Sequence, residues 1–452
     1  MSFKMFLFDQ SQARLRANLE TVDLTVTDFS PDPSIGIPPL VNPWTPVDQN
    51  GNALPMPPNA GGYGYEFIYD TRAQARIFLD KFRQHLIDEG TPELERIYGV
   101  GLTALPFTAA HRNQHWCAGR GRGVRFGTRR MARQVIGADS LDSESLTGNK
   151  VKVFIVDQGI NKIHLESMGG TFGGGLDWEV DGVFRKAGQA DWPYTPARRE
   201  HTAMLLRSVL DLAPNAEIYD LPVLPARITD IKTFTTDTLF AFWIMKWMME
   251  FIEGPWVVLS AWGLVNRFAE TLHGEYSNNP LHQLNYLHGL IGQSHDVIFA
   301  AGNSGQFCAD PRASGYDRGP GRSIFGANGH PKVTSVGAVR PDRVWIGASS
   351  QGPGPAGLNP GGDPPEKPDF CTPSWFAEDV DRSLRSTGTS AAAGLAAGAV
   401  AALREKWKPA TVDPAALRAT LRNTARKVDG SNWNGRTGAG VLDLGAAISE
   451  LP

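Results

Sequence analysis

The sequence predicts an α/β fold, a doubly wound, mostly parallel sheet with helices on both faces. Short apolar runs recur along the chain, and such runs are typical of strands buried on both faces of a parallel sheet. Segments with helical apolar spacing lie between several of these runs, as crossover connections require. The predicted strands are Val151–Val156, Glu217–Val223, Trp256–Ala261, Asp296–Ala301 and Val333–Val339.

The first predicted strand, Val151–Val156, ends in a carboxylate, because Asp157-Gln158-Gly159 follows it directly. Ligands bind at the carboxyl ends of the strands in open α/β sheets, so Asp157 is a candidate site residue. Taken alone, the same pattern more often marks an aspartate that caps the next turn.

A predicted helix begins at a histidine. The apolar residues after His201 have helical spacing, and the segment Ala213–Ala216 ends the helix before the strand Glu217–Val223. A lone histidine at such a position is usually a structural side chain, so His201 gains meaning only together with other segments.

The next two strands follow a long apolar helix and precede a carboxamide. Residues Asp237–Glu253 are apolar but too short to span a bilayer, which predicts a crossover helix of the sheet. The strand Asp296–Ala301 runs into Gly302-Asn303. Asn303 is either a turn former or a donor of a hydrogen bond to an oxyanion.

The most informative segment runs from Ser386 to Gly394. It places Ser390 at the first turn of a helix rich in small residues, Ala391–Ala402. Small side chains let a helix lie deep in a core, where a serine at its start has a fixed hydroxyl and a backbone N–H that points into a cleft. These are the properties of a nucleophile, although a buried alanine-rich helix with a serine cap is also common.

Taken together, these segments resemble the subtilisin-like serine proteases, or subtilases. The candidate residues occur in the order Asp, His, Asn, Ser, which differs from the order in chymotrypsin and in the α/β-hydrolases. Further similar segments extend the resemblance over about residues 147–451, and they are Val257–Gly263, Ser349–Pro353, Lys367–Phe370 and Gly438–Asp443.

The resemblance implies a serine endopeptidase with a peptide or protein substrate. Its triad would be Asp157, His201 and Ser390, with Asn303 in the oxyanion hole. It also implies a substrate cleft lined by the ends of two strands, namely Ser260, Trp262, Gly263, Ala300, Ala301 and Gly302. No cofactor is required, and the calcium ions that are common in the family cannot be mapped onto ligands in this sequence.

Three positions depart from the pattern of the family. Gln158 stands where the family has Thr or Ser, His-Gly-Thr is shortened to His201-Thr202, and Gly394 replaces a proline. The triad is intact while its supports are altered, so two functions stay open. One is a selective, regulatory endopeptidase inside the cell, and the other is a catalytically weak, subtilase-like module that binds peptides.

An amino-terminal accessory region, residues 1–145, precedes the predicted peptidase domain of residues 146–452. It contains a Pro- and Gly-rich linker at residues 30–64 and a predicted helix over Ala73–Glu89. The region is either a propeptide that inhibits the site intramolecularly or a fixed element that binds a regulatory partner. Its arginine-rich stretch 112–133 is compatible with an activation linker and with a solvated basic loop.

Composition gives no reason to expect a nucleic-acid partner or a membrane span. Lys and Arg number 44 against 47 Asp and Glu, a net charge of -3. Three cysteines and an amino terminus unlike a secretory signal predict a cytoplasmic protein. His111 and His115 have the spacing of a metal pair without further ligands, and Gly169–Gly175 is expected to be a flexible loop near the cleft.

Overall fold

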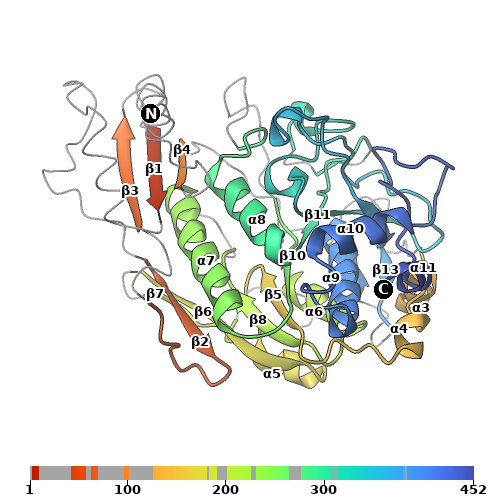
Figure 1. Cartoon of the computed structure of the whole chain (residues 1–452), viewed down its shortest axis with the longest axis horizontal. Coiled ribbons are helices and arrows are strands. Elements are labelled where there is room, and N and C mark those ends of the chain that lie inside the picture. Colours follow the sequence, from red (N-terminus) through yellow and green to blue (C-terminus); the bar gives the residue numbers. More distant parts are fainter. Residues whose placement is uncertain are drawn as a thin grey trace, which may run out of the picture.

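The computed structural model describes residues 3–9, 42–57, 63–69, 96–100, 126–180, 183–190, 201–224, 231–263, 276–307, 309–310, 313–379, 381 and 384–452. Within these residues one nine-stranded sheet has the order β12-β11-β10-β9-β5-β8-β6-β2, and β7 pairs with β6 outside this path (Figure 1). The pairs from β12 to β6 are parallel, whereas β2 and β7 run antiparallel to β6. The strands are β2 Trp44–Asp48, β5 Lys152–Val156, β6 Thr171–Val180, β7 Val183–Arg185, β8 Glu217–Leu221, β9 Trp256–Ser260, β10 Asp296–Ala300, β11 Thr334–Val339 and β12 Phe370–Pro373.

All five predicted strands occur in this sheet, and the predicted fold class is confirmed. Every residue of β5, β9 and β10 is buried. Successive side chains of β5 enter opposite cores, because Val153 and Ile155 join one cluster while Phe154 and Val156 join the other. Helices cover both faces, which explains why these strands are continuous apolar runs rather than alternating ones.

Two pairs of helices make the two layers. On one face lie α6, His201–Leu210, and α9, Gly388–Lys406; on the other lie α7, Ile231–Phe251, and α8, Gln283–Ser294 (Figure 1). The predicted crossover helix is therefore present as α7. No helix among the described residues is both long and apolar enough to cross a membrane.

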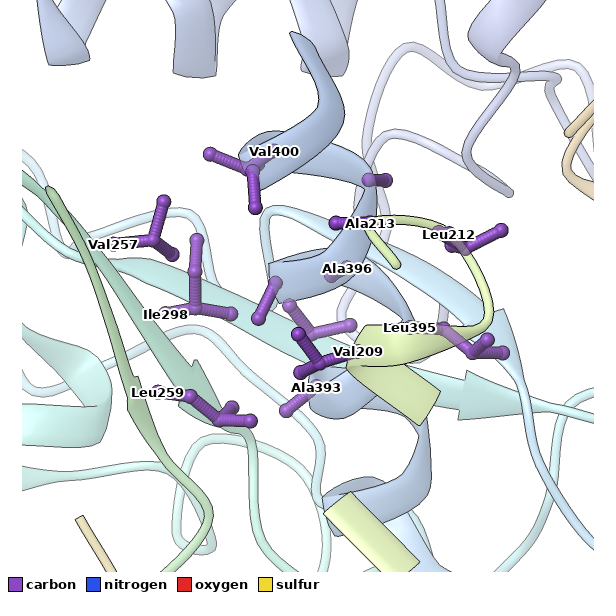
Figure 2. Packing of buried hydrophobic residues seen from close by; sticks show 14 of the residues in the cluster. Val209, Leu212, Ala213, Val257, Leu259, Ile298, Ala393, Leu395, Ala396 and Val400 are labelled. Carbon is purple, nitrogen blue, oxygen red and sulfur yellow. The ribbon is translucent and has the colours of Figure 1, made fainter. Parts of the chain in front are cut away.

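Small residues let α9 lie close to α6 in the core. A Cβ atom added at Gly394 would lie 2.8 Å from the Cβ of Ser208, and one at Gly398 would lie 2.8 Å from the carbonyl oxygen of Val209. Figure 2 shows Ala393, Leu395, Ala396 and Val400 of α9 within the same cluster as Val209 and the strand residues Val257, Leu259 and Ile298. The glycine at position 394 thus fits the narrow gap between the two helices.

The glycine run Gly169–Gly175, expected as a flexible loop, is largely part of strand β6, so that expectation was wrong. Side chains are excluded by close neighbours on both sides. A Cβ at Gly173 would lie 2.3 Å from the ring of Tyr219, and one at Gly174 would lie 2.3 Å from the carbonyl oxygen of Val47. Glycine is used here for close packing within a sheet and not for freedom of movement.

The remaining elements surround this core. A separate sheet of order β3-β1-β4 is antiparallel, and β13 pairs antiparallel with β14. These elements are β1 Phe3–Asp9, β3 Tyr63–Tyr69, β4 Arg96–Val100, β13 Phe376–Ala377, β14 Arg385–Ser386, α3 Arg129–Val135, α4 Asp139–Ser143, α5 Lys162–Ser167, α10 Pro414–Asn423 and α11 Leu444–Glu450.

Two segments of the amino-terminal region contact the large sheet and its helices. Strand β2 pairs with β6 along its whole length, and its residues Trp44 and Val47 are each 3% exposed. Helices α3 and α4 contribute Ala132 and Leu141 to the core that also holds α6 and α9. The predicted boundary at residue 145 remains a prediction, and the predicted helix Ala73–Glu89 lies outside the described residues.

Candidate active site

Strand ends and helix starts position the candidate catalytic groups. Asp157 directly follows β5, His201 is the first residue of α6, and Ser390 is the third residue of α9. Asn303 follows β10, after Gly302, whose φ of 107° suits a glycine. All four candidates are buried, with Asn303 and His201 each 7% exposed, Ser390 1% and Asp157 fully covered.

Asp157 and His201 form a hydrogen-bonded pair. The Nδ1 atom of His201 lies 2.7 Å from Oδ2 of Asp157. An ionised carboxylate only accepts hydrogen bonds, so Nδ1 carries the proton and Nε2 is the basic nitrogen. The other oxygen, Oδ1, accepts the backbone N–H of Gln158 at 2.7 Å and the hydroxyl of Thr202 at 3.3 Å. These three contacts hold the carboxylate and the imidazole in one orientation.

The Nε2 atom of His201 is buried and has no hydrogen-bond partner among the described residues. The hydroxyl of Ser390 instead donates to the carbonyl oxygen of Ala261 at 3.3 Å. Val156 pairs with Ser260, so Ala261 is level with Asp157, and Ser390 lies at the same end of the sheet as Asp157 without a Ser–His hydrogen bond. Such bonds are often absent without substrate and form in the reacting complex.

Asn303 is fixed by the residue that precedes Ser390. Its Oδ1 accepts the backbone N–H of Thr389 at 2.9 Å and the Thr389 hydroxyl at 3.2 Å. Because its oxygen is used in this way, the amide group of Asn303 presents N–H donors on its other side. Gly388, at φ 71°, leaves room for it, since a Cβ there would lie 3.2 Å from Nδ2.

The predicted cleft residues lie at the ends of β9 and β10. Ser260 ends β9, and its hydroxyl is buried without a partner among the described residues. The ring of Trp262 packs against aromatic rings beneath the site, with centroids 6.3 Å from Phe242 and 5.7 Å from Phe299. Trp262 is buried at 2% exposure, and the substrate-binding role predicted for it, for Ser260 and Gly263 and for the segment Ala300-Ala301-Gly302 stays a prediction.

Asn328 connects the two strand ends, and sequence reasoning missed it. Its amide donates to the carbonyl oxygens of Trp262 and Ala300, both at 2.8 Å. A Cβ at Gly263 would lie 3.1 Å from Oδ1 of Asn328, which explains the glycine there. The signal in the sequence is a turn, Gly326–Gly329, with a single buried amide inside it.

Asp220, in the interior of β8, was also missed. It is fully buried, and its Oδ2 accepts the backbone N–H groups of Ile160 and Gly188, both at 2.9 Å. The pKa of this carboxyl is raised to about 7, because burial and the charges of Asp157 and Asp177 raise it by more than the two N–H groups lower it. A carboxylate between Tyr219 and Leu221, inside a predicted strand, was the available signal.

Among the described residues, no group of three or more His, Cys, Asp or Glu side chains is placed to hold a metal ion. The calcium expectation remains untested. The candidate pair His111 and His115 and most of the arginine-rich stretch 112–133 lie outside the described residues. Cys371 is a free, buried cysteine, and burial raises the pKa of its thiol.

Residues 245–440 match the model of the subtilase family. No curated protein matches the sequence. Among solved structures, fervidolysin from Fervidobacterium pennivorans, a keratinolytic enzyme related to subtilisin, superposes with a TM-score of 0.53 at 16% identity. That match covers all of this chain, which spans 62% of fervidolysin. At this identity the superposition shows a shared fold alone.

Two further solved structures are MycP1 proteins. MycP1 from the ESX-1 type VII secretion system matches with a TM-score of 0.48 and 17% identity, over 77% of this chain and 92% of that protein. MycP1 from Mycobacterium smegmatis matches with a TM-score of 0.47 and 17% identity, over 77% of this chain and 91% of that protein.

Proposed function

We propose that this chain, a member of the subtilase family, is a serine endopeptidase that hydrolyses peptide bonds through Asp157, His201 and Ser390. The observation that carries the proposal is the buried, unpartnered Nε2 of His201, on a ring held by the 2.7 Å contact with Asp157. A buried polar atom without a partner is costly and calls for an explanation. The absence of a partner among the described residues is explained if Nε2 is a base that accepts the proton of Ser390 once a substrate is bound.

The reaction would proceed by acyl transfer. The hydroxyl of Ser390 turns from the carbonyl of Ala261, gives its proton to Nε2 of His201, and Oγ bonds to the substrate carbonyl carbon. His201 then gives this proton to the leaving amine as the C–N bond breaks. Water hydrolyses the acyl-enzyme by the same route, while Asp157 stabilises the imidazolium and holds its tautomer.

The oxyanion of each tetrahedral intermediate would be bound by Asn303 and by the backbone N–H of Ser390. Thr389 holds the oxygen of the Asn303 amide, which aims the NH₂ group without any need to reorganise during the reaction. Donors fixed in advance contribute more to catalysis than mobile ones. Asn303→Ala is therefore expected to lower kcat by about 10²–10³ and to change KM much less.

We further propose that the biological role of the chain is that of a selective, regulatory protease in the cytoplasm. The burial of all four candidate residues supports a site that admits few peptides. The amino-terminal region supports regulation, because β2 forms the edge of the large sheet and Trp44 is buried there. These contacts favour a permanent element for residues 42–57 over one that leaves on maturation. Extensive degradation of casein by the purified chain would contradict selectivity.

The alternative is a catalytically weak module that binds peptides in the same cleft. The hydrogen bond from Ser390 to Ala261, in place of one to His201, is the observation that favours it. The two functions differ in turnover. A module would bind a peptide stably and leave it intact, whereas a protease would release two fragments.

A peptide-library cleavage assay, read by mass spectrometry, tests the proposal. Ser390→Ala is expected to abolish cleavage, and Asn303→Ala to leave a folded enzyme with the low kcat stated above. Ser335→Ala is the matched control, because Ser335 is also fully buried and its hydroxyl has no partner among the described residues, but it lies in β11. Equal cleavage by wild-type and Ser390→Ala protein would overturn the proposal.

A further inference from the structure

Asp220 combines three features that a merely structural carboxylate lacks. It is fully buried, its Oδ1 has no hydrogen-bond partner among the described residues, and no basic side chain bonds its Oδ2. Burial of an ionisable group without a compensating charge is costly for the fold. An apolar residue at position 220 would not carry this cost. The presence of a carboxylate there therefore suggests that it has a function.

The position of Asp220 links it to the catalytic aspartate. In the parallel pairing of β8 with β5, Asp220 is opposite Ile155, two residues before Asp157. Its Oδ2 then accepts the N–H of Ile160, three residues after Asp157. The carboxyl of Asp220 therefore lies beneath the bend by which the chain leaves β5 and carries Asp157 into the site.

The same oxygen also holds a second segment of chain. It accepts the N–H of Gly188, whose carbonyl oxygen accepts the N–H of Lys162 at 2.7 Å. The N–H of Ala190 in turn donates to the carbonyl of Ile160 at 2.9 Å. Asp220 thus bonds the segment after Asp157 and residues 188–190 through one carboxyl oxygen, beside the hydrogen bonds that join the two segments directly.

The charges around Asp220 have one sign. Asp157 acts on it from the end of β5 and Asp177 from β6, and both are acidic. Asp177 is half-buried, accepts the N–H of Ala187 at 2.8 Å, and has Lys186 as a neighbouring positive charge. A negative charge on Asp220 would therefore add to that of Asp157 and favour the imidazolium form of His201.

We propose that Asp220 is a positioning residue of the catalytic centre: it holds the chain after Asp157 against Gly188, and its charge acts through Asp157 on the protonation of His201. This inference rests on the proposed protease function. Asp220 touches neither substrate nor the reacting atoms, and its effect on the reaction passes through the Asp157–His201 pair.

The test is the pH dependence of kcat/KM for wild type and Asp220→Asn. Asparagine keeps an oxygen that accepts both N–H groups but carries no charge. Without that charge His201 becomes the neutral base at lower pH, so the acid limb of the profile is expected to shift to lower pH. Asp413→Asn is the matched control, because it also exchanges a carboxylate that accepts a backbone N–H, that of Ala416 at 2.8 Å, but at the start of α10; it should leave the acid limb in place.

Thermal unfolding gives a second measurement that needs no activity. Because the pKa of Asp220 is raised from 3.8 to about 7, the unfolded chain releases this proton at a lower pH than the folded protein, and wild type loses stability as the pH rises towards 7. The stability gain of Asp220→Asn over wild type should therefore grow up to about pH 7 and stay constant at higher pH. If Asp220→Asn does not fold, Asp220→Ser replaces it, since a hydroxyl also accepts hydrogen bonds without charge.

The outcomes separate the two proposals. A gain in stability with an unmoved acid limb would overturn the positioning role and leave Asp220 structural. An unchanged acid limb and unchanged pH dependence of unfolding would overturn the inference entirely. If the wild-type chain shows no cleavage at any pH, the proposed function fails, while the unfolding series still decides whether Asp220 carries the buried charge.

Discussion

Two buried carboxylates lie close to the candidate site, and their environments are opposite. Glu378, just after β13, bonds Arg129 through both oxygens at 2.5 and 2.8 Å, and it also accepts the hydroxyl of Ser386. Arg207 of α6 lies 3.5 Å away. Asp220, in contrast, is held by two backbone N–H groups and leaves one oxygen without a partner among the described residues.

Because their partners differ, the pKa of Glu378 is lowered and the pKa of Asp220 is raised. Burial raises the pKa of both groups. At Glu378 the hydrogen bond and charge of Arg129, with Ser386 and Arg207, outweigh burial and lower the pKa. At Asp220 nothing outweighs it, and the pKa rises to about 7. The charge of Glu378 is thus paired with arginines of α3 and α6, whereas the carboxyl of Asp220, next to the segment that follows Asp157, has no cationic partner among the described residues.

The largest loss of stability is expected when Arg129, the main cationic partner of Glu378, is removed. Arg129→Met leaves Glu378 and Asp211 without the guanidinium that contacts both, and it should lower the free energy of unfolding by about 3–5 kcal/mol. Urea denaturation of the full chain measures the change. Arg133→Met, on the same helix but partly exposed, is the control and should cost about 1 kcal/mol or less. Equal losses of stability in the two variants would show that the buried pairing of Arg129 with Glu378 contributes no more than the partly exposed contacts of Arg133.

The pH dependence of stability should separate Glu378 from Asp220. The lowered pKa of Glu378 means that its contribution is present above its usual pKa of 4.5 and is lost as the pH falls through the folded value. Asp220 contributes below its usual pKa of 3.8, and this contribution is lost as the pH rises towards 7.

Thermal unfolding from pH 3.5 to pH 8 therefore has two expected signatures. Glu378→Gln should be less stable than wild type at neutral pH, and the gap should close in acid. Asp220→Asn should show its gain over wild type at neutral and higher pH. Parallel curves for the two variants would contradict the assignment of one paired and one unpaired carboxylate.

The smallest loss of stability is expected when the hydroxyl of Ser386, which donates to Glu378, is removed. Ser386→Ala removes one hydrogen bond to the ionised Glu378 while both arginines remain, so a loss of about 1–2 kcal/mol is expected. The same change should raise the pKa of Glu378 towards its usual value and shift the acid unfolding midpoint to higher pH. A loss as large as that of Arg129→Met would show that the hydroxyl, and not the guanidinium, holds the carboxylate.

The sequence predicted the residues that stand at the ends of regular elements. Asp157, His201, Asn303 and Ser390 each follow a buried strand or begin a helix, so local pattern made them candidates, and the resemblance to subtilases joined them into one predicted site. It also predicted the five central strands, because burial on both faces leaves a continuous apolar run.

Pairings between distant residues could not be predicted in the same way. Arg129 and Glu378 are 249 positions apart, and neither occurs in a local pattern that predicts a partner. The edge strand β2 was hidden because the proline- and glycine-rich composition around it resembles a linker, and only its pairing with β6 makes it a strand. Asp220 was missed because its register opposite Ile155 depends on which strands become neighbours.

If Ser390 is an activated nucleophile, it should react covalently with a serine-directed probe, even when no substrate is known. Full-length wild type, Ser390→Ala and the Ser335→Ala control are treated with a fluorophosphonate probe, and intact-mass and peptide mass spectrometry locate the adduct. We expect one adduct on Ser390 in wild type and in the control, in a chain that retains residues 42–57, and none in Ser390→Ala. Folded wild-type protein without an adduct, or an adduct that persists in Ser390→Ala, would contradict the account.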